Sequence, residues 1–282
     1  MLLPMLLLAV TADAFLMNGV WNDGQAEIAF YQVERELDQY GRPNPQSFLM
    51  GTYLVKHDFD RVRQSKARED ATNRVSAFKW AAFYEFESDN SYQYKRNYVV
   101  NASQTDLTPF KQSYSGFDWC SNQYRELAFD PTGRVELLMR SDDYGNERES
   151  FDAPANAYPV TLVPLLVRAL DFSESSEHAF SLLLEDGTTV PVRATFVGRE
   201  SVDTPAGSRD AERIRLRYEG TYRSFISRRG AAEETYWRGL GADRPLLAIE
   251  SQSYRVRLVE HVRSPYWREN VYEKLRRVTT RP

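Results

Sequence analysis

Apolar and aromatic residues recur at every second position along much of this chain, which is the period of a strand with one buried face. Large residues alternate with smaller or polar ones over residues 78–86 and again over 92–100, and Ser88-Asp89-Asn90-Ser91 between them favours a turn. This pattern predicts a β-hairpin. The residues expected to share one face of it are Phe78, Trp80, Ala82, Tyr84, Phe86, Tyr92, Tyr94, Arg96, Tyr98 and Val100.

Similar alternation predicts further hairpins along the chain. In one of them the turn is Asp130-Pro131-Thr132-Gly133, where proline presets the first turn angle and glycine accepts a positive φ. Successive hairpins without intervening helices predict a meander, in which strands neighbour one another in sequence order. The expected pairs are 124–129 with 135–140, 179–184 with 189–196, and 194–202 with 209–218, followed by strands at 246–249 and 254–261.

Two segments depart from the strand pattern. Val163, Leu166, Val167 and Leu170 have helical spacing, and Pro164 suits a first helical turn, so we expect a short helix there that packs on the sheet. Residues 265–277 fit a second helix or a strand equally well. The predicted fold is therefore all-β, an antiparallel meander forming a curved sheet, half-barrel or sandwich, with one or two short packed helices.

The first residues of the chain predict export. Residues 1–10 are almost all apolar, and Thr11-Ala12-Asp13-Ala14 has the small-residue spacing of a signal-peptide cleavage site. The apolar run is shorter than the ~20 residues that span a bilayer. We therefore predict a signal peptide at 1–14 and a periplasmic or secreted protein, with a buried N-terminal strand or helix as the alternative. The rest, 15–282, is expected to be one β-rich domain with a possible sub-boundary near 152–158, and peripheral to a membrane at most.

Composition narrows the possible functions. The 36 Lys and Arg residues against 40 Asp and Glu give a net charge of −4, unlike the basic balance of a nucleic-acid-binding protein. The one cysteine, Cys120, allows no intramolecular disulfide, and we interpret it as a small buried residue rather than a nucleophile or cross-link. The 3 histidines share no metal-ligand spacing, so neither a metal nor a cofactor is expected. The charged segment 61–74 is expected to be a surface loop.

Two parts of the sequence resemble families of exported bacterial proteins. The segment 21–27 together with Trp119-Cys120-Ser121-Asn122 resembles a family often labelled septum formation inhibitors, although the phosphate loop of the pyrophosphatases that own that name is absent. The second half, with its hairpin over 198–207, is similar to an exported family of unknown function. The resemblance implies a β-rich Gram-negative envelope protein like the periplasmic lipoprotein carriers, and it supplies no catalytic residues. The motif residues are Trp21, Asp23, Gly24, Glu27, Trp119, Cys120, Gly198, Glu200 and Gly207.

These patterns lead to one main functional hypothesis, a non-enzymatic binding or assembly factor for an amphiphile or another envelope component. The concave face of the sheet would be lined by Phe78, Trp80, Tyr84, Phe86 and Tyr94. Arginine rows on a sheet face would meet anionic lipid headgroups, unless they form a solvated outer face with nearby glutamates. Arg199 and Glu200 either belong to that binding surface or pair across strands. One row consists of Arg213, Arg215 and Arg217 and the other of Arg255 and Arg257, whereas Arg199 is considered separately with Glu200.

Two alternatives belong to other classes of protein. A hydrolase of envelope glycans or esters would use Asp23 and Glu27 as paired carboxylates converging in an open cleft. Asp23 followed by Gly24 also fits a simple turn. A structural protein would instead pair a sheet edge with a strand of another envelope protein.

Overall fold

The computed structural model describes residues 14–37, 43–87, 92–119, 121–223, 230–268 and 273. The predicted signal peptide, the turn at 88–91, Cys120 and most of 265–277 lie outside these residues. The helical elements are η1 (Gly19–Asn22), η2 (Val160–Leu162) and α1 (Val163–Ala169). The strands are β1 (Ala26–Leu37), β2 (Pro43–Asp60), β3 (Ser65–Lys66), β4 (Arg74–Glu87), β5 (Gln93–Ser103), β6 (Pro109–Phe117), β7 (Asn122–Phe129), β8 (Arg134–Ser141), β9 (Gly145–Asp152), β10 (Ala157–Pro159), β11 (Glu177–Leu183), β12 (Thr189–Thr204), β13 (Gly207–Arg223), β14 (Gly230–Gly239), β15 (Leu246–Ser251) and β16 (Tyr254–Ser264).

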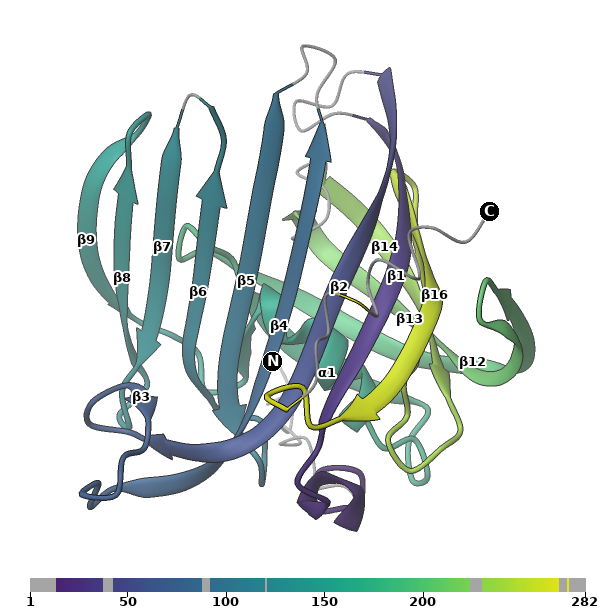
Figure 1. Cartoon of the computed structure of the whole chain (residues 1–282), viewed down its shortest axis with the longest axis horizontal. Helices are drawn as coiled ribbons and strands as arrows, with labels where there is room; N and C mark the ends of the chain where they lie inside the picture. Colours follow the sequence, from purple (N-terminus) through teal and green to yellow (C-terminus); the bar gives the residue numbers. More distant parts are fainter. Residues whose placement is uncertain are drawn as a thin grey trace, which may run out of the picture.

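The described strands form one 16-stranded sheet that curves around α1 (Figure 1). Its order is β10-β11-β12-β13-β14-β15-β16-β1-β2-β4-β5-β6-β7-β8-β9, with β3 added beside β2. Neighbours along this order are antiparallel except for the β10–β11 pair. The predicted all-β meander is confirmed as a single curved sheet.

The predicted hairpins form with the expected partners. In the β4–β5 hairpin Phe86 lies opposite Tyr94 and Phe78 lies opposite Ala102, so the aromatic residues of the two strands share a face. Strands β7 and β8 pair, β11 pairs with β12, and β12 pairs with β13. Gly133 and Gly207 have φ angles of 92° and 104°, which are accessible to glycine at little cost. These turns are therefore built as the sequence indicates.

Among the described strands, the first lies beside the last. Strand β1 pairs with β2 on one side and with β16 on the other, where Ala29 is opposite His261 and Glu27 is opposite Arg263. Side chains two residues apart on a strand share a face, so this register brings the side chains of Glu27 and His261 to the same concave surface. The pairing connects the two halves of the sheet and creates the polar cluster described below.

Helix α1 lies inside the curve of the sheet (Figure 1). The predicted helix is confirmed, but all seven of its residues are buried, Arg168 included, rather than one apolar stripe. It packs in a core that includes Phe78, Trp80 and Tyr84, which are 0%, 4% and 5% exposed. The open concave lining expected from the sequence is therefore wrong at these three residues. A helix that is buried on every side needs partners all round, and the concave face supplies them.

The two ends of the sheet approach each other through side chains. Leu127 and Phe129 of β7 and Val135 of β8 pack with Ala157 of β10 and Leu183 of β11. Such contacts give the sheet a barrel-like form without a continuous ring of strand pairing. In the part of the chain that the structure describes, no helix has the length and apolar character needed to cross a bilayer.

Candidate functional site

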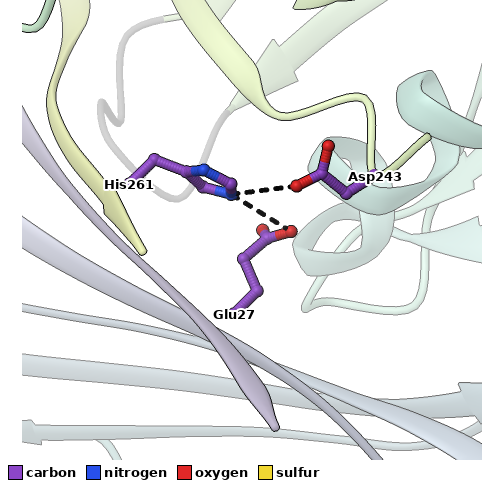
Figure 2. Close-up of side chains that lie close together, drawn as sticks. All are labelled: Glu27, Asp243 and His261. Carbon is purple, nitrogen blue, oxygen red and sulfur yellow. Dashed lines mark ion pairs between the residues drawn. The ribbon is translucent and has the colours of Figure 1, made fainter. Parts of the chain in front are cut away.

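A cluster of charged side chains lies beside α1, on the inner side of the sheet. It joins Glu27 of β1, Arg168 of α1, Asp243 of the β14–β15 loop and His261 of β16, and Figure 2 shows the two carboxylates and the imidazole directed toward one another. Glu27 faces inward because it alternates with the outward Ile28 of the same strand. No two of the four residues are neighbours in the sequence, so only the fold brings them together.

Arg168 and Glu27 form a buried bidentate ion pair. Arg168 Nη1 donates to Glu27 Oε1 over 2.8 Å, and Nη2 donates to Oε2 over 2.6 Å. Their side chains are only 3% and 5% exposed. Burial by itself raises the pKa of Glu27, but Arg168 and then His261 outweigh it and lower that pKa to about 2. Glu27 is therefore ionised at neutral pH and fixes the end of α1 to β1.

His261 lies between the two carboxylates of the cluster. Its Nε2 atom is 3.5 Å from Glu27 Oε2 and 3.5 Å from Asp243 Oδ2 (Figure 2). This nitrogen is buried and has no hydrogen-bond partner. A buried polar atom without a partner costs free energy, so it calls for a specific cause. Glu27, Asp243 and His261 each offer one ligand atom, and together these atoms could hold a metal ion.

The predicted motif residue Trp21 covers this cluster. Its ring and that of Phe15 lie 5.6 Å and 5.4 Å from the guanidinium carbon of Arg168. The Trp21 indole Nε1 donates to the Phe15 carbonyl over 2.8 Å, which fixes the orientation of both rings. The aromatic residues shield the Arg168–Glu27 pair from water and strengthen it.

Asp23 does not join Glu27. Arg263 Nε and Nη2 each donate to the Asp23 carboxylate over 2.8 Å, and Asp23 also accepts from the Gln25 backbone over 2.8 Å. Gly24 has φ 71°, as the turn interpretation requires. The carboxylates of Asp23 and Glu27 thus bind different arginines, one in a turn and one in the core. The predicted catalytic pair is not formed, because the bidentate pair with Arg168 holds Glu27 inside the sheet.

The predicted arginine rows are matched by glutamates on neighbouring strands. Gly198 lies at a bulge with φ 150°, and the residues after it pair across β12 and β13 as the alternative interpretation expects. Because each arginine has a carboxylate partner, these rows carry little net positive charge. The pairs are Arg199–Glu212 at 2.9 Å, Arg213–Glu200 at 3.2 Å, Arg215–Glu233 at 3.2 Å and Arg217–Glu233 at 3.6 Å.

Other predicted residues have separate surroundings. Phe86 and Tyr94 are partly exposed and stack with ring centroids 5.0 Å apart. Trp119 is 71% exposed. Strand β9 ends the sheet, and Gly145–Ser150 are all exposed along it. Pairing of an edge with a partner strand stays a prediction.

Unmatched positive charge occurs instead on the outer face of β2–β6. A groove of about 630 Å³ is lined there by Lys66, Lys79 and Lys111, together with His57. Lys111 pairs with Glu126 at 2.8 Å, whereas neither Lys66 nor Lys79 has an ion pair within the described residues. Burial lowers the pKa of His57, so the imidazole is neutral at pH 7 and the lysines supply the charge. Tyr266 and Trp267, which are 37% and 53% exposed, line the same groove.

A second buried carboxylate, Glu234, accepts hydrogen bonds from three phenols. Tyr218 and Tyr236 donate to Glu234 Oε2 over 2.6 Å and 2.7 Å, and Tyr254 donates to Oε1. Burial raises the pKa of Glu234 despite these three hydrogen bonds. The residue is 1% exposed and out of reach of a ligand in solvent, so we interpret it as a polar element of the core.

Comparisons with known proteins give a fold but no family. No family model and no curated protein matches this sequence. The chain is similar in structure to a β-barrel-like protein of domain of unknown function DUF1849 from Brucella abortus, with a TM-score of 0.52 and 6% sequence identity. The superposition covers 84% of this chain and 97% of that one. At such low identity the likeness establishes the fold alone.

The sequence patterns did not point to Arg168, Asp243 or the lysine groove. Arg168 lies in an otherwise apolar helix. Its charge could have indicated a buried ion pair, because an arginine in an apolar segment needs a carboxylate partner. The lysines lie on separate strands, and no local sequence motif indicates that they share a groove. Of the predicted site residues, Glu27 belongs to the cluster and Trp21 covers it.

Proposed function

We propose that this chain is a non-enzymatic binding protein of the bacterial envelope that holds the anionic headgroup of an amphiphile in its outer groove. The observation that carries the proposal is the pair of lysines, Lys66 and Lys79, that line the groove without carboxylate partners among the described residues. Lysine ammonium groups bind phosphate as point charges. The exposed aromatic rings of Tyr266 and Trp267 suit the boundary between headgroup and acyl chain.

The groove offers both positive charge and aromatic surface, which an anionic amphiphile needs. Lys79 Nζ lies 5.6 Å from the centre of the Tyr53 ring, and that ring packs 5.8 Å from Tyr266. Val55 and Val99 also line the groove. The headgroup would lie on the lysines and the first methylenes on the aromatic rings. The predicted signal peptide supports placing this ligand in the envelope.

The test is sedimentation with vesicles of phosphatidylcholine, alone or containing phosphatidylglycerol. We expect binding only to the anionic vesicles, and weaker binding at high salt because exposed charges are screened. The K66Q/K79Q variant removes two charges worth about 1 kcal/mol each near an anionic surface, so binding should fall roughly 30-fold. The R215Q/R217Q variant is the matched control, because it removes the same charge from the paired rows.

The outcome distinguishes binding of an amphiphile from binding of a free anion and from nonspecific charge attraction. Equal losses in K66Q/K79Q and R215Q/R217Q would mean that net charge, not the groove, determines binding. Complete displacement by millimolar inorganic phosphate would assign the groove to a free anion. Either result, or binding to neutral vesicles alone, contradicts the proposal.

A further inference from the structure

We propose that Glu27, Asp243 and His261 form a zinc site, with solvent supplying the fourth ligand. The donor atoms are Glu27 Oε2, Asp243 Oδ2 and His261 Nε2, which all lie within 4.8 Å of one another. They come from β1, β16 and the β14–β15 loop, and Figure 2 shows them directed to one point. This inference is independent of the outer groove, which lies on the opposite face of the sheet.

Two of the three separations between the donor atoms match a tetrahedral centre. Zinc binds imidazole nitrogen and carboxylate oxygen at ~2.1 Å, so two ligands at the tetrahedral angle lie ~3.4 Å apart. The observed distances from His261 Nε2 to the two carboxylates are both 3.5 Å. A direct charge-assisted hydrogen bond would shorten them to ~2.7–2.9 Å. The spacing therefore suits a bridging cation better than a bridging proton.

The unpartnered nitrogen points to the same conclusion. His261 Nε2 is buried and forms no short hydrogen bond, although two carboxylate oxygens lie 3.5 Å from it. A metal ion would satisfy this nitrogen and both carboxylates together. One nitrogen donor with two carboxylates favours zinc over calcium or magnesium, which prefer six or more oxygen donors.

Arg168 would act as a positioning residue. It holds both oxygens of Glu27 and so fixes the carboxylate that binds the ion, as outer hydrogen bonds do at other metal sites. Together the two carboxylates and the Arg168 guanidinium carry one net negative charge, which attracts a cation. The side chains of Asp243 and His261 are 19% and 11% exposed, so this side of the cluster is only partly buried.

The test uses the full-length protein stripped of metals with a chelator and titrated with Zn²⁺ against a chromogenic competitor. We expect one Zn²⁺ per chain, with affinity at least tenfold lower in His261→Ala and in Asp243→Asn. His178→Ala is the matched control, because His178 contacts the Asp171 carbonyl outside the cluster. The affinity of this variant for Zn²⁺ should equal that of the wild type. Circular dichroism of each variant confirms folding, and Asp243→Asn alters only a loop residue.

A spectroscopic measurement distinguishes a built site from surface binding. Co²⁺ should give the intense visible absorption of four-coordinate cobalt in the wild type and lose it in Asp243→Asn. The proposal is overturned if stoichiometric binding is absent, if His178→Ala and His261→Ala lose affinity equally, or if the Co²⁺ spectrum is that of a six-coordinate aqua ion.

Discussion

Replacing Arg168 with methionine tests the role of the buried ion pair most directly. The change keeps much of the side-chain volume but removes both hydrogen bonds to Glu27, which is 4% exposed. Glu27 is then left as a charged group inside the sheet without its arginine. Removal of one partner from a buried pair typically costs about 3–5 kcal/mol of unfolding free energy.

The pKa of Glu27 gives a second measure of the same effect. In the folded protein this pKa is about 2, against an ordinary value of 4.5, which corresponds to roughly 3 kcal/mol. Because the folded pKa is the lower one, this stability is present above pH 4.5 and is lost as the pH falls through about 2. The wild type should therefore lose stability across that window, and Arg168→Met should lose less there because its Glu27 is not held ionised by the arginine.

The assays are denaturant and thermal unfolding of the metal-free protein, followed by tryptophan fluorescence and circular dichroism. For a domain of this size we expect the melting temperature of Arg168→Met to fall by about 6–20 °C. The control is Arg148→Met, whose pair with Glu136 is 75% and 59% exposed and should be worth less than ~1 kcal/mol. The double variant R168M/E27Q should be less destabilised than the sum of its single changes. Simple additivity, or a loss below ~1 kcal/mol for Arg168→Met, would refute the reasoning.

Three further changes test other parts of the fold by unfolding measurements. Burial raises the pKa of Glu234 in the folded protein, so the stability linked to this group is present below pH 4.5 and is lost as the pH rises through the folded pKa. Over that pH range Glu234→Gln should gain stability relative to the wild type. Stability profiles that stay parallel with pH would contradict this expectation. A Cβ at Gly51 would lie 2.3 Å from the Phe83 ring, so Gly51→Ala should lower the free energy of unfolding by about 1–3 kcal/mol. Gly19→Ala is the control: a Cβ there has nothing within 4 Å, so the free energy of unfolding should change by no more than ~0.5 kcal/mol. Arg238→Met removes donors to three carbonyls at the end of α1 and should cost ~3 kcal/mol; an unchanged denaturation midpoint would show that the helix end needs no such donor.

Local patterns were sufficient to predict most of the fold. The β4–β5 hairpin and α1 are encoded by residues close together in the sequence, so alternation and helical spacing locate them. The spacing could not show that α1 is enclosed rather than laid on a surface. Arg168 interrupts an otherwise apolar helix, and its buried partner lies 141 residues away on β1.

The sites were less predictable because they depend on register between distant strands. His261 and Glu27 come together only through the β1–β16 pairing, which no spacing of histidines could indicate. The arginine rows suggested a binding surface because their cross-strand partners, such as Glu212 beside Arg199, could not be assigned without that register. Lys66 and Lys79, which have no ion pair within the described residues, lie on different strands and share no local sequence motif.

The position of β1 between β2 and β16 has a consequence for biosynthesis. One edge of β1 stays without its neighbour until the final long strand has been made, roughly 10–50 s later at usual rates of translation. Until then the nascent chain presents an unsatisfied backbone edge and an unfilled core, both of which attract other polypeptides. Folding must therefore await synthesis of β16, and chains that stop before Tyr254 are expected to aggregate rather than yield a smaller stable protein.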